Sequence, residues 1–172
     1  MNETDQNPRG DESDESDPIA KFVARFPRLF HGKFPRVMSS LPHGWIDVVT
    51  RLFVDLDALL DDAQARRLEI IQVKEKFAGL CVYWSLGKEK TSIIDIIVVD
   101  SVQRLRTYPE KPSDAFAQIA ARVGQAEDEA AKTCQRCSNG GAARNQTGGW
   151  LVTLCEACRV SGSPQHQDQD RT

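Results

Sequence analysis

Four of the five cysteines in this 172-residue chain form two Cys-x-x-Cys pairs near its end. The first pair is Cys134 and Cys137, and the second is Cys155 and Cys158. Each pair can present two thiolates to one metal ion, and the separation is typical of tetrahedral four-cysteine zinc sites. Between the pairs, the turn-forming stretch SNGGAARNQTGG leads into the strand-like WLVTL, which indicates a short hairpin. The spacing therefore predicts a zinc ribbon, in which a hairpin joins two metal-binding turns.

Three other uses of the paired cysteines are less consistent with the sequence. A redox Cys-x-x-Cys motif usually occurs once, after a strand and at the start of a helix. Disulfides form in oxidising compartments, for which this chain shows no targeting signal. An iron–sulfur centre could use the same four cysteines, but the spacing resembles a zinc ribbon more closely. Because all four ligand positions would be filled by protein, we expect a structural Zn²⁺ ion with no open position for substrate.

The composition, with 40% hydrophobic and 27% charged residues, is ordinary for a soluble globular protein. No apolar run reaches the roughly 18–20 residues of a membrane helix, so we expect no membrane association. Residues 1–17 are acidic and lack the apolar core of a signal peptide, which predicts a cytoplasmic protein. Residues 1–17 and 161–172 have the composition of disordered tails. Between them we expect an α+β core over 18–133 and a zinc ribbon over 134–160, packed on that core.

The net charge of −3 is unevenly distributed. Residues 1–18 carry −6, residues 19–51 carry +5 and residues 52–172 carry −2. The acidic segment could shield the basic, aromatic-rich segment that follows it from other polyanions. We prefer the simpler interpretation of a solubilising tail beside an ordinary charged surface. Whether the basic segment binds anything is left open by the sequence.

Helical periodicity marks three segments. The first starts at an Asp-Pro pair typical of a helix N-terminus and continues over 18–27. The second has apolar residues at helical spacing over 45–65, and the third over 113–133. The third helix would lead directly into Cys134, so we expect the cysteine segment to pack on the helices.

Alternation with a period of two predicts a hairpin over 68–86, with one apolar face for helices to cover. Residues 91–106, TSIIDIIVVDSVQRLR, allow two interpretations. Their isoleucines and valines suit a strand, whereas the spacing of the apolar residues suits a buried helix. We predict a helix, because Thr91 or Ser92 would cap it. The expected fold class is α+β, with helices packed on a small antiparallel hairpin or sheet and a C-terminal zinc ribbon.

Three stretches resemble motifs of one group of proteins: VKEKFAGLCVYW (73–84), AAKTCQRC (130–137) and GWLVTLCEAC (149–158). The group consists of small bacterial and phage-borne proteins. They share a Lys-Glu-Lys-Phe-Gly-Gly-Leu-Arg hairpin, a Thr-Cys-x-x-Cys-Gly turn and a Trp-x-x-Thr-Leu-Cys-x-x-Cys ending. FPRLF (26–30) and GWIDVV (44–49) fit the same group. The resemblance implies the architecture and the zinc site, and it implies no activity.

The chain departs from this pattern at three positions. Ala78 and Ser138 stand where the group has glycine, so the two tight turns here must accept a side chain. Cys81 stands where arginine is usual, which weakens a basic patch that could otherwise hold phosphate or carboxylate. Cys81 itself belongs to no paired motif, and we expect a buried, inert thiol.

Three classes of function remain. An enzyme is disfavoured, because the three histidines form no recognisable catalytic motif and no phosphate-binding loop occurs. Nucleic-acid binding is the alternative, since zinc ribbons often do this and basic residues alternate with aromatics. The isoelectric point of about 5.6 argues against a dedicated nucleic-acid binder. We favour a non-catalytic protein-interaction module, acting as an adaptor, an inhibitor or an immunity-type protein.

The partner we expect is another protein, with nucleic acid as the alternative and no small-molecule substrate. The candidate interaction surface has two parts. One is the less apolar face and the turn of the predicted hairpin, and the other is the basic surface of the cysteine segment. Its residues are Lys74, Lys76, Tyr83, Arg136 and Arg144.

Overall fold

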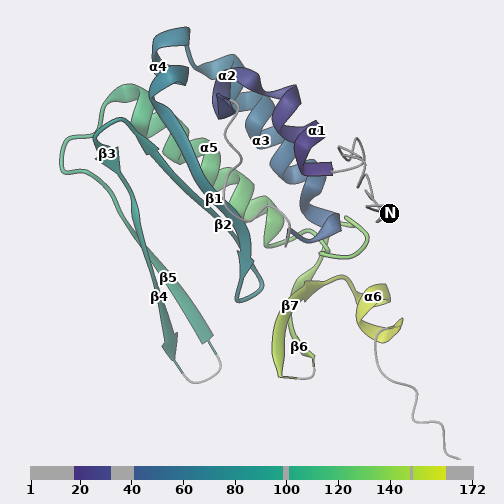
Figure 1. Ribbon diagram of the computed structural model, residues 1–172. Helices are drawn as coiled ribbons and strands as arrows, with labels where there is room; N and C mark the ends of the chain where they lie inside the picture. The colour runs from purple at the N-terminus through teal and green to yellow at the C-terminus, as the bar shows by residue number, and fades with distance from the viewer. Residues whose placement is uncertain (1–17, 32–40, 99–100, 148, 162–172) are drawn as a thin grey trace, which may run out of the picture.

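The computed structural model describes residues 18–31, 41–98, 101–147 and 149–161 (Figure 1). Within these ranges the chain is α+β, with six α-helices, one 3₁₀ helix and three small antiparallel sheets. The predicted fold class is therefore confirmed, while the predicted tails lie outside the described residues except for Ser161. The elements are α1 (Pro18–Arg25), α2 (Pro27–Phe30), η1 (His43–Trp45), α3 (Ile46–Leu59), α4 (Asp62–Arg67), β1 (Leu68–Lys76), β2 (Gly79–Leu86), β3 (Glu89–Lys90), β4 (Ser92–Val98), β5 (Ser101–Thr107), α5 (Asp114–Ala130), β6 (Ala143–Thr147), β7 (Trp150–Leu154) and α6 (Glu156–Ser161).

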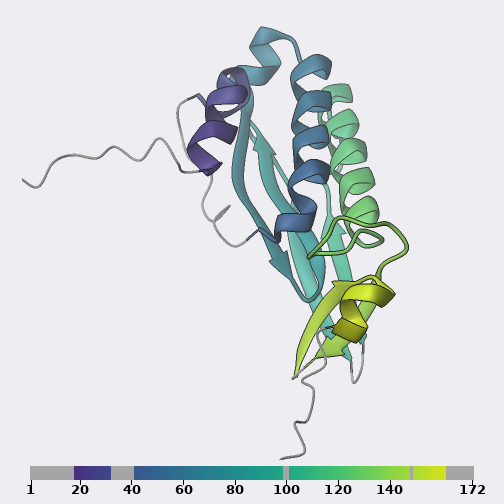
Figure 2. The ribbon, with the colours of Figure 1, turned by 90° about the vertical axis from the view of Figure 1, so that its right-hand side faces the viewer.

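The first sheet has the strand order β1-β2-β3 and one face covered by helices. Helices α3 and α5 lie side by side across this face (Figure 2). Direct cross-strand partners such as Val73 and Val82 lie on the same face of the β1–β2 pair, and both are fully buried. The predicted hairpin over 68–86 is thus confirmed, with a bulge between Ile70 and Gln72.

Aromatic side chains fill much of the space between the helices and the sheet. The ring centroids of Trp84 on β2 and Phe116 on α5 are 4.6 Å apart. Phe53 of α3 is surrounded by Phe22, Phe26 and Phe30 at centroid distances of 5.1–6.0 Å. These contacts fix α1 and α2 against α3. The phenylalanines of the basic N-terminal segment are therefore core residues wherever the structure describes them.

The helix expected over 45–65 is divided into three parts. Trp45 lies in a 3₁₀ turn, and α3 ends at Leu59 because Leu60 adopts an extended conformation. Asp61 then caps α4: its side chain accepts a hydrogen bond from the backbone N–H of Gln64, whose side chain accepts one from the Asp61 N–H. This capping box starts a new helix within a periodic apolar pattern. The prediction of one continuous helix was wrong for that reason.

The prediction of a helix over 91–106 was also wrong, because this segment forms the antiparallel ribbon β4–β5. Its strands pair from Ser92 with Thr107 to Val98 with Ser101. Pairing brings Asp95 opposite Arg104, and the two side chains form an ion pair with an Nε–Oδ1 distance of 2.8 Å. Intrinsic preference for strand and this buried ion pair outweigh the helical spacing of the apolar residues.

No helix in the described part of the chain is both long and apolar enough to cross a membrane.

Candidate metal centre

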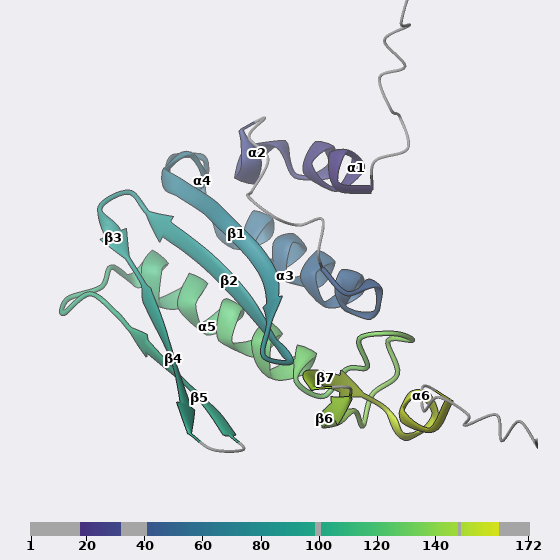
Figure 3. The same cartoon turned by 60° about the horizontal axis from the view of Figure 1, so that its bottom comes forward.

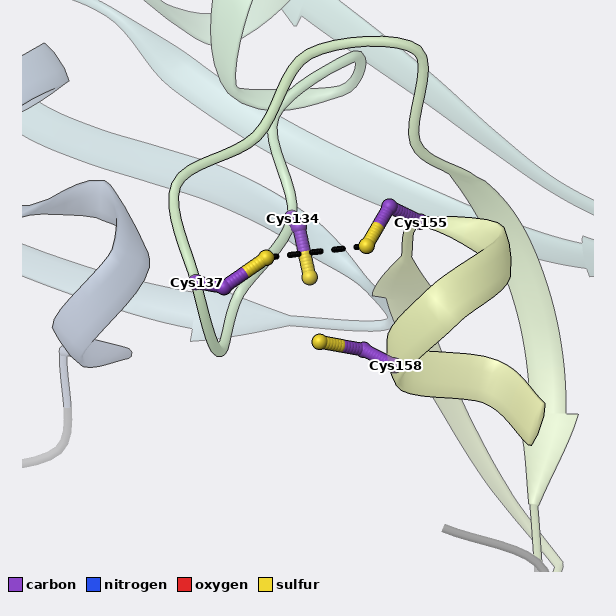
Figure 4. A group of neighbouring side chains, drawn as sticks. All are labelled: Cys134, Cys137, Cys155 and Cys158. Atoms are coloured by element: carbon purple, nitrogen blue, oxygen red, sulfur yellow. Dashed lines mark hydrogen bonds between the residues drawn. The ribbon is translucent and has the colours of Figure 1, made fainter. Parts of the chain in front are cut away.

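The two cysteine pairs meet beside β6, β7 and α6, which lie at one end of the molecule, below α3 and α5 in Figure 1. The sulfurs of Cys134, Cys137, Cys155 and Cys158 all lie within 4.8 Å of one another. The sulfurs of Cys137 and Cys155 are 3.5 Å apart, and all four side chains point toward a common centre (Figure 4). Cys134 and Cys155 are buried, whereas Cys137 is exposed.

A tight turn places the first pair directly after α5. The backbone N–H of Cys134 donates to the carbonyl of Asn139, and that of Ser138 donates to the carbonyl of Cys134. Ser138 adopts a left-handed conformation with φ = 63°, which glycine would adopt without strain. The predicted tight turn is therefore present with a side chain in it.

The hairpin β6–β7 and helix α6 place the second pair. Cys155 follows the last residue of β7, and Cys158 lies one helical turn later in α6. The strand expected from WLVTL is thus confirmed as β7. The backbone N–H of Arg159 donates to the carbonyl of Cys155, which fixes the spacing of the two thiols.

The backbone around Cys134 favours a thiolate. Burial of this sulfur raises its pKa, but backbone N–H groups of Cys155, Cys137 and Arg136 are directed at it and lower the pKa to about 6. Hydrogen bonds to the charged form of a group lower its pKa. Thiolates are the form in which cysteine binds metal, so these amides are oriented as a metal site requires.

Four converging sulfurs can hold one metal ion, and they supply a complete tetrahedral set of ligands. Such a set leaves no position for water or substrate on the ion. An ion held by these four sulfurs would cross-link the chain, and soft or borderline cations suit the donors best.

Three hydrogen bonds join this cysteine cluster to the helices and the first sheet. The backbone N–H of Gly44 donates to the carbonyl of Gln135 at 2.9 Å, and Trp45 Nε1 donates to the carbonyl of Thr133 at 2.8 Å. Thr153 Oγ1 of β7 donates to the carbonyl of Ala78, at the tip of β1–β2, at 2.7 Å. We call these three contacts the joint.

Gly44 is required at the joint because the two backbones approach closely. A Cβ atom on this residue would lie 2.7 Å from the carbonyl carbon of Gln135 and closer still to the carbonyl oxygen of Cys134. Trp45 is fully buried next to it. The joint therefore depends on a glycine followed by a tryptophan at the start of α3.

Comparison with protein-family models, with curated proteins and with solved structures finds no match to this chain. The stretches that carried the resemblance in the sequence include the residues of the joint: Gly44 and Trp45, Thr133, Ala78 and Thr153. In this molecule they connect the cysteine cluster to the rest of the fold.

The residues predicted for an interaction surface lie on the β1–β2 hairpin and on the cysteine segment. Lys74 and Tyr83 share the helix-free face of β1–β2, where the lysine Nζ is 5.0 Å from the ring centroid. Lys76 forms an ion pair with Asp95 at 2.7 Å. Arg136 and Arg144, by contrast, are exposed within the cysteine segment. The five residues thus come from two parts of the fold, the β1–β2 hairpin and the cysteine segment, and their role as an interaction surface stays a prediction.

Cys81 lies apart from the cysteine cluster, on β2. It is fully buried, and burial raises its pKa to about 11. A thiol with this pKa is protonated at neutral pH and is a poor nucleophile. The expectation of a buried thiol is confirmed, and its low reactivity stays a prediction.

Two surface features were not identified from the sequence. Trp150, at the start of β7, is 78% exposed, the largest exposure among the large hydrophobic residues that the structure describes. Ile94, Ile96 and Leu105 of the β4–β5 ribbon are each about half exposed. The exposure of Trp150 could have been predicted from the sequence, because this tryptophan directly follows two glycines of a predicted turn. The second requires the strand register, which the sequence alone does not supply.

Proposed function

We propose that the cysteine cluster binds a structural Zn²⁺ ion and that the protein is a non-catalytic, zinc-stabilised protein-binding module. Zinc suits four thiolates in a tetrahedron, and such an ion contributes on the order of 10 kcal/mol to folding. The ion would hold β6–β7 and α6 in place against the joint. A small hairpin with a rigid base can then present side chains to a partner.

The exposed side chain of Trp150 carries the proposal. It lies at the start of β7, paired with Thr147 at the turn of the hairpin. Tryptophan is enriched at the energetic centres of protein interfaces, because it buries a large area at little conformational cost. Trp45 and Trp84 are fully buried in the core, whereas Trp150 does not contribute to it.

The faces of the hairpin favour protein over nucleic acid as the partner. In β6–β7, Trp150 and Thr147 share a face with Asn145 and Val152, which are also paired. Arg144 pairs with Thr153 and lies on the opposite face. Stacking on a nucleic-acid base usually combines an aromatic ring with cations that contact the adjacent phosphates. Trp150 has no such cation on its own face of the hairpin.

Nucleic-acid binding is the second candidate function. Residues 134–160 contain three arginines and only one acidic residue. Arg136 and Arg144 are both exposed, as is Lys132, two residues after α5 ends. These charges could contact phosphates without Trp150 taking part.

The test compares Trp150→Ala with Val160→Ala, a control that removes another exposed apolar side chain, on α6. Each variant is expressed with an affinity tag in the source cells, purified under reducing conditions and analysed for stoichiometric bound protein. We expect a partner protein with the wild type and with Val160→Ala, and none with Trp150→Ala. Purified complex should also protect Trp150 from acrylamide quenching.

A second experiment tests the nucleic-acid alternative. Retention of the wild type on heparin or DNA, falling steeply between low and physiological salt, would indicate a nucleic-acid binder. If Arg144→Ala weakened that retention and Trp150→Ala did not, the protein-binding proposal would be wrong and the second candidate correct.

A further inference from the structure

The β4–β5 ribbon joins the rest of the fold at one end only. β4 follows β3 after Thr91, and β5 leads into α5 through residues 108–113. Figure 3 shows both connections close to β3, and β4 and β5 form a sheet of their own. The carboxylate of Glu89 in β3 accepts hydrogen bonds from the backbone N–H and the hydroxyl of Ser113, at 2.7 and 2.8 Å. This contact fixes the two connections next to each other.

Side chains of the ribbon do not contribute to the apolar core. Its inward face carries Ile93, Asp95, Val102, Arg104 and Arg106, which are all partly buried. Among the residues that the structure describes, the apolar core between the helices and the first sheet includes none from the ribbon, and neither Ile93 nor Val102 packs against it. The ribbon is therefore held in place mainly by its polar contacts.

Arg104 connects the ribbon to the β1–β2 hairpin. Its Nε donates to Asp95 at 2.8 Å, and Asp95 also pairs with Lys76 of β1 at 2.7 Å. Its Nη1 donates to the carbonyl of Leu80 on β2 at 2.9 Å, and its Nη2 donates to the carbonyl of Lys76 at 3.3 Å. One guanidinium group thus contacts both strands of the hairpin.

Arg106 extends these contacts to α5. It pairs with Glu127, whose carboxylate also accepts a hydrogen bond from the backbone N–H of Val82 at 3.2 Å. β3 pairs with only the last two residues of β2 in the described part of the chain. At Leu80 and Val82, the edge of β2 is therefore covered by charged side chains instead of a strand.

Cys81 lies under the same side chains. Its thiol is on the helix-free face of β2, opposite Lys74, and is fully buried. It belongs to neither of the two apolar clusters described for this chain. Burial raises the pKa of Cys81, the nearby guanidinium of Arg104 lowers it, and the carboxylates of Glu127 and Asp95 raise it. The inward face of the ribbon therefore covers Cys81 and excludes water from it.

We propose that the ribbon opens away from β2 as one unit, while the helices and the first sheet stay folded. Opening uncovers Cys81 and the edge of β2 at Leu80 and Val82. It removes no residue from the described apolar core, and the separated charges regain the hydration that they lost in buried ion pairs. Opening therefore costs less free energy than unfolding of the whole chain, as local opening generally does.

The closed and open states differ in what they offer to other molecules. In the closed state, the N–H of Val82 and the carbonyl of Leu80 are bonded within the chain. In the open state, this edge can pair with an extended peptide. A two-stranded ribbon is marginally stable on its own, so β4 and β5 should lose their pairing when they leave β2. The ion pairs of the ribbon thereby control access to the edge.

Labelling of Cys81 with N-ethylmaleimide, a neutral thiol reagent, measures the opening. The reduced full-length chain, supplemented with zinc, is labelled for increasing times, and mass spectrometry of its fragments locates the label. We expect slow labelling of Cys81 at about 0.05 M salt and several-fold faster labelling at about 1 M, where charges more than about 3 Å apart are screened. Low concentrations of urea should change this rate little, because local opening exposes less surface than global unfolding.

Arg104→Gln removes the contacts of the ribbon with the hairpin and keeps a polar side chain. This variant should label at Cys81 at least about tenfold faster, as expected for the loss of hydrogen bonds from a charged group. It also removes a cation that lowers the pKa of Cys81, so faster labelling would have to come from opening. Arg51→Gln, which breaks an exposed ion pair between α3 and α5, should label at the wild-type rate. A rate that neither salt nor Arg104→Gln changes would overturn the inference.

Native-state hydrogen exchange of the wild type gives a second measurement, in case Arg104→Gln does not fold. The hydrogen-bonded amides of β4 and β5 should exchange together, and much faster than those of β1 and α5. If they exchanged only with the amides of β1 and α5, the ribbon would open only on global unfolding, and the inference would be wrong. Trp150 lies on another element, so Trp150→Ala should open as the wild type does whether or not the proposed function is correct.

Discussion

Gly44 shows how one residue can control the attachment of a metal site. It has no side chain, and its backbone N–H donates directly to the carbonyl of Gln135, in the first cysteine turn. The close approach leaves no room for a Cβ atom between η1 and Cys134. The sequence showed a glycine before a tryptophan, but not what it contacts, because the contact joins residues about ninety positions apart.

We predict that Gly44→Ala destabilises the protein by about 1–3 kcal/mol, the usual cost of overpacking. The added methyl group must push the cysteine turn away from η1, which weakens both the joint and metal binding. Urea unfolding followed by circular dichroism measures the first effect, and competition with a zinc chelator measures the second.

Gly124→Ala is the matched control. Gly124 lies within α5, and a Cβ atom there would meet nothing within 4 Å. Alanine is preferred over glycine in a helix by about 1 kcal/mol, so this variant should be slightly more stable than the wild type. If both variants gained stability, the close approach at Gly44 would not exist in solution.

At the scale of secondary-structure elements, the sequence was most informative where one pattern dominated. The period of two in residues 68–86 predicted β1 and β2, and the helical spacing from residue 113 predicted α5. The side chain of Ser113 caps this helix by accepting a hydrogen bond from the backbone N–H of Phe116. Residues 91–106 contained both helical and strand signals, and local preference could not decide between them. The deciding contacts are long-range, since Arg104 and Arg106 bond to β2 and α5. No local window of sequence contains that information.

The contact between the ribbon and α5 leads to a prediction about pH. The carboxylate of Glu127 in α5 accepts a hydrogen bond from the backbone N–H of Val82 and forms an ion pair with Arg106. Burial raises its pKa above the ordinary value of 4.5, although Arg106 opposes this shift. A carboxyl group with a raised pKa binds protons more tightly in the folded state than in the unfolded state. Its contribution to stability therefore falls as the pH rises from its unfolded-state pKa through its higher folded-state pKa.

We predict that Arg106→Gln destabilises the protein more at pH 7 than at pH 4. Without the arginine, the pKa of Glu127 rises further, and at pH 7 a buried carboxylate is left without its partner. The cost should be about 3 kcal/mol at pH 7, as for a broken buried pair, and much smaller at pH 4, where Glu127 is protonated. Urea unfolding at the two pH values measures the difference.

Arg51→Gln provides the comparison for this pH effect. Arg51 pairs with Glu129 between α3 and α5, but both side chains are about half exposed. Exposed pairs contribute about 0.5 kcal/mol, so we expect a small loss that is similar at both pH values. An equal loss at pH 4 and pH 7 in Arg106→Gln would contradict the assignment of a buried charge to Glu127.

At the scale of the whole molecule, the cysteine spacing predicted which residues converge, and the structure brings all four sulfurs together. The spacing could not predict where the cluster is attached. The joint uses Gly44, Trp45 and Ala78, which precede the first cysteine of the cluster by more than fifty residues. The boundary at residues 133 and 134 therefore remains a prediction about domains, and its physical test is whether the two parts unfold together.

We predict that removing the metal destabilises the helices as well as the cysteine cluster. Elemental analysis of protein made under reducing conditions should find one zinc ion per chain, retained in Cys81→Ser and lost in Cys137→Ser. Chelation frees the cysteine turns, and the three hydrogen bonds of the joint are worth about 1 kcal/mol each. For a chain of this size, about 3 kcal/mol lowers the melting temperature by roughly 6–12 °C.

The indole NMR signals of two tryptophans show whether removing the metal disturbs the hydrogen bonds of the joint. The indole N–H of Trp45 donates to the carbonyl of Thr133, so its NMR signal should shift on chelation. Trp84 lies in the same core, but its indole N–H has no partner among the described residues, and its signal should move little. Helical melting unchanged by chelation, with the Trp45 signal in place, would mean that the cysteine cluster folds independently. The hydrogen bonds of the joint would then not couple the stability of the helices to metal binding.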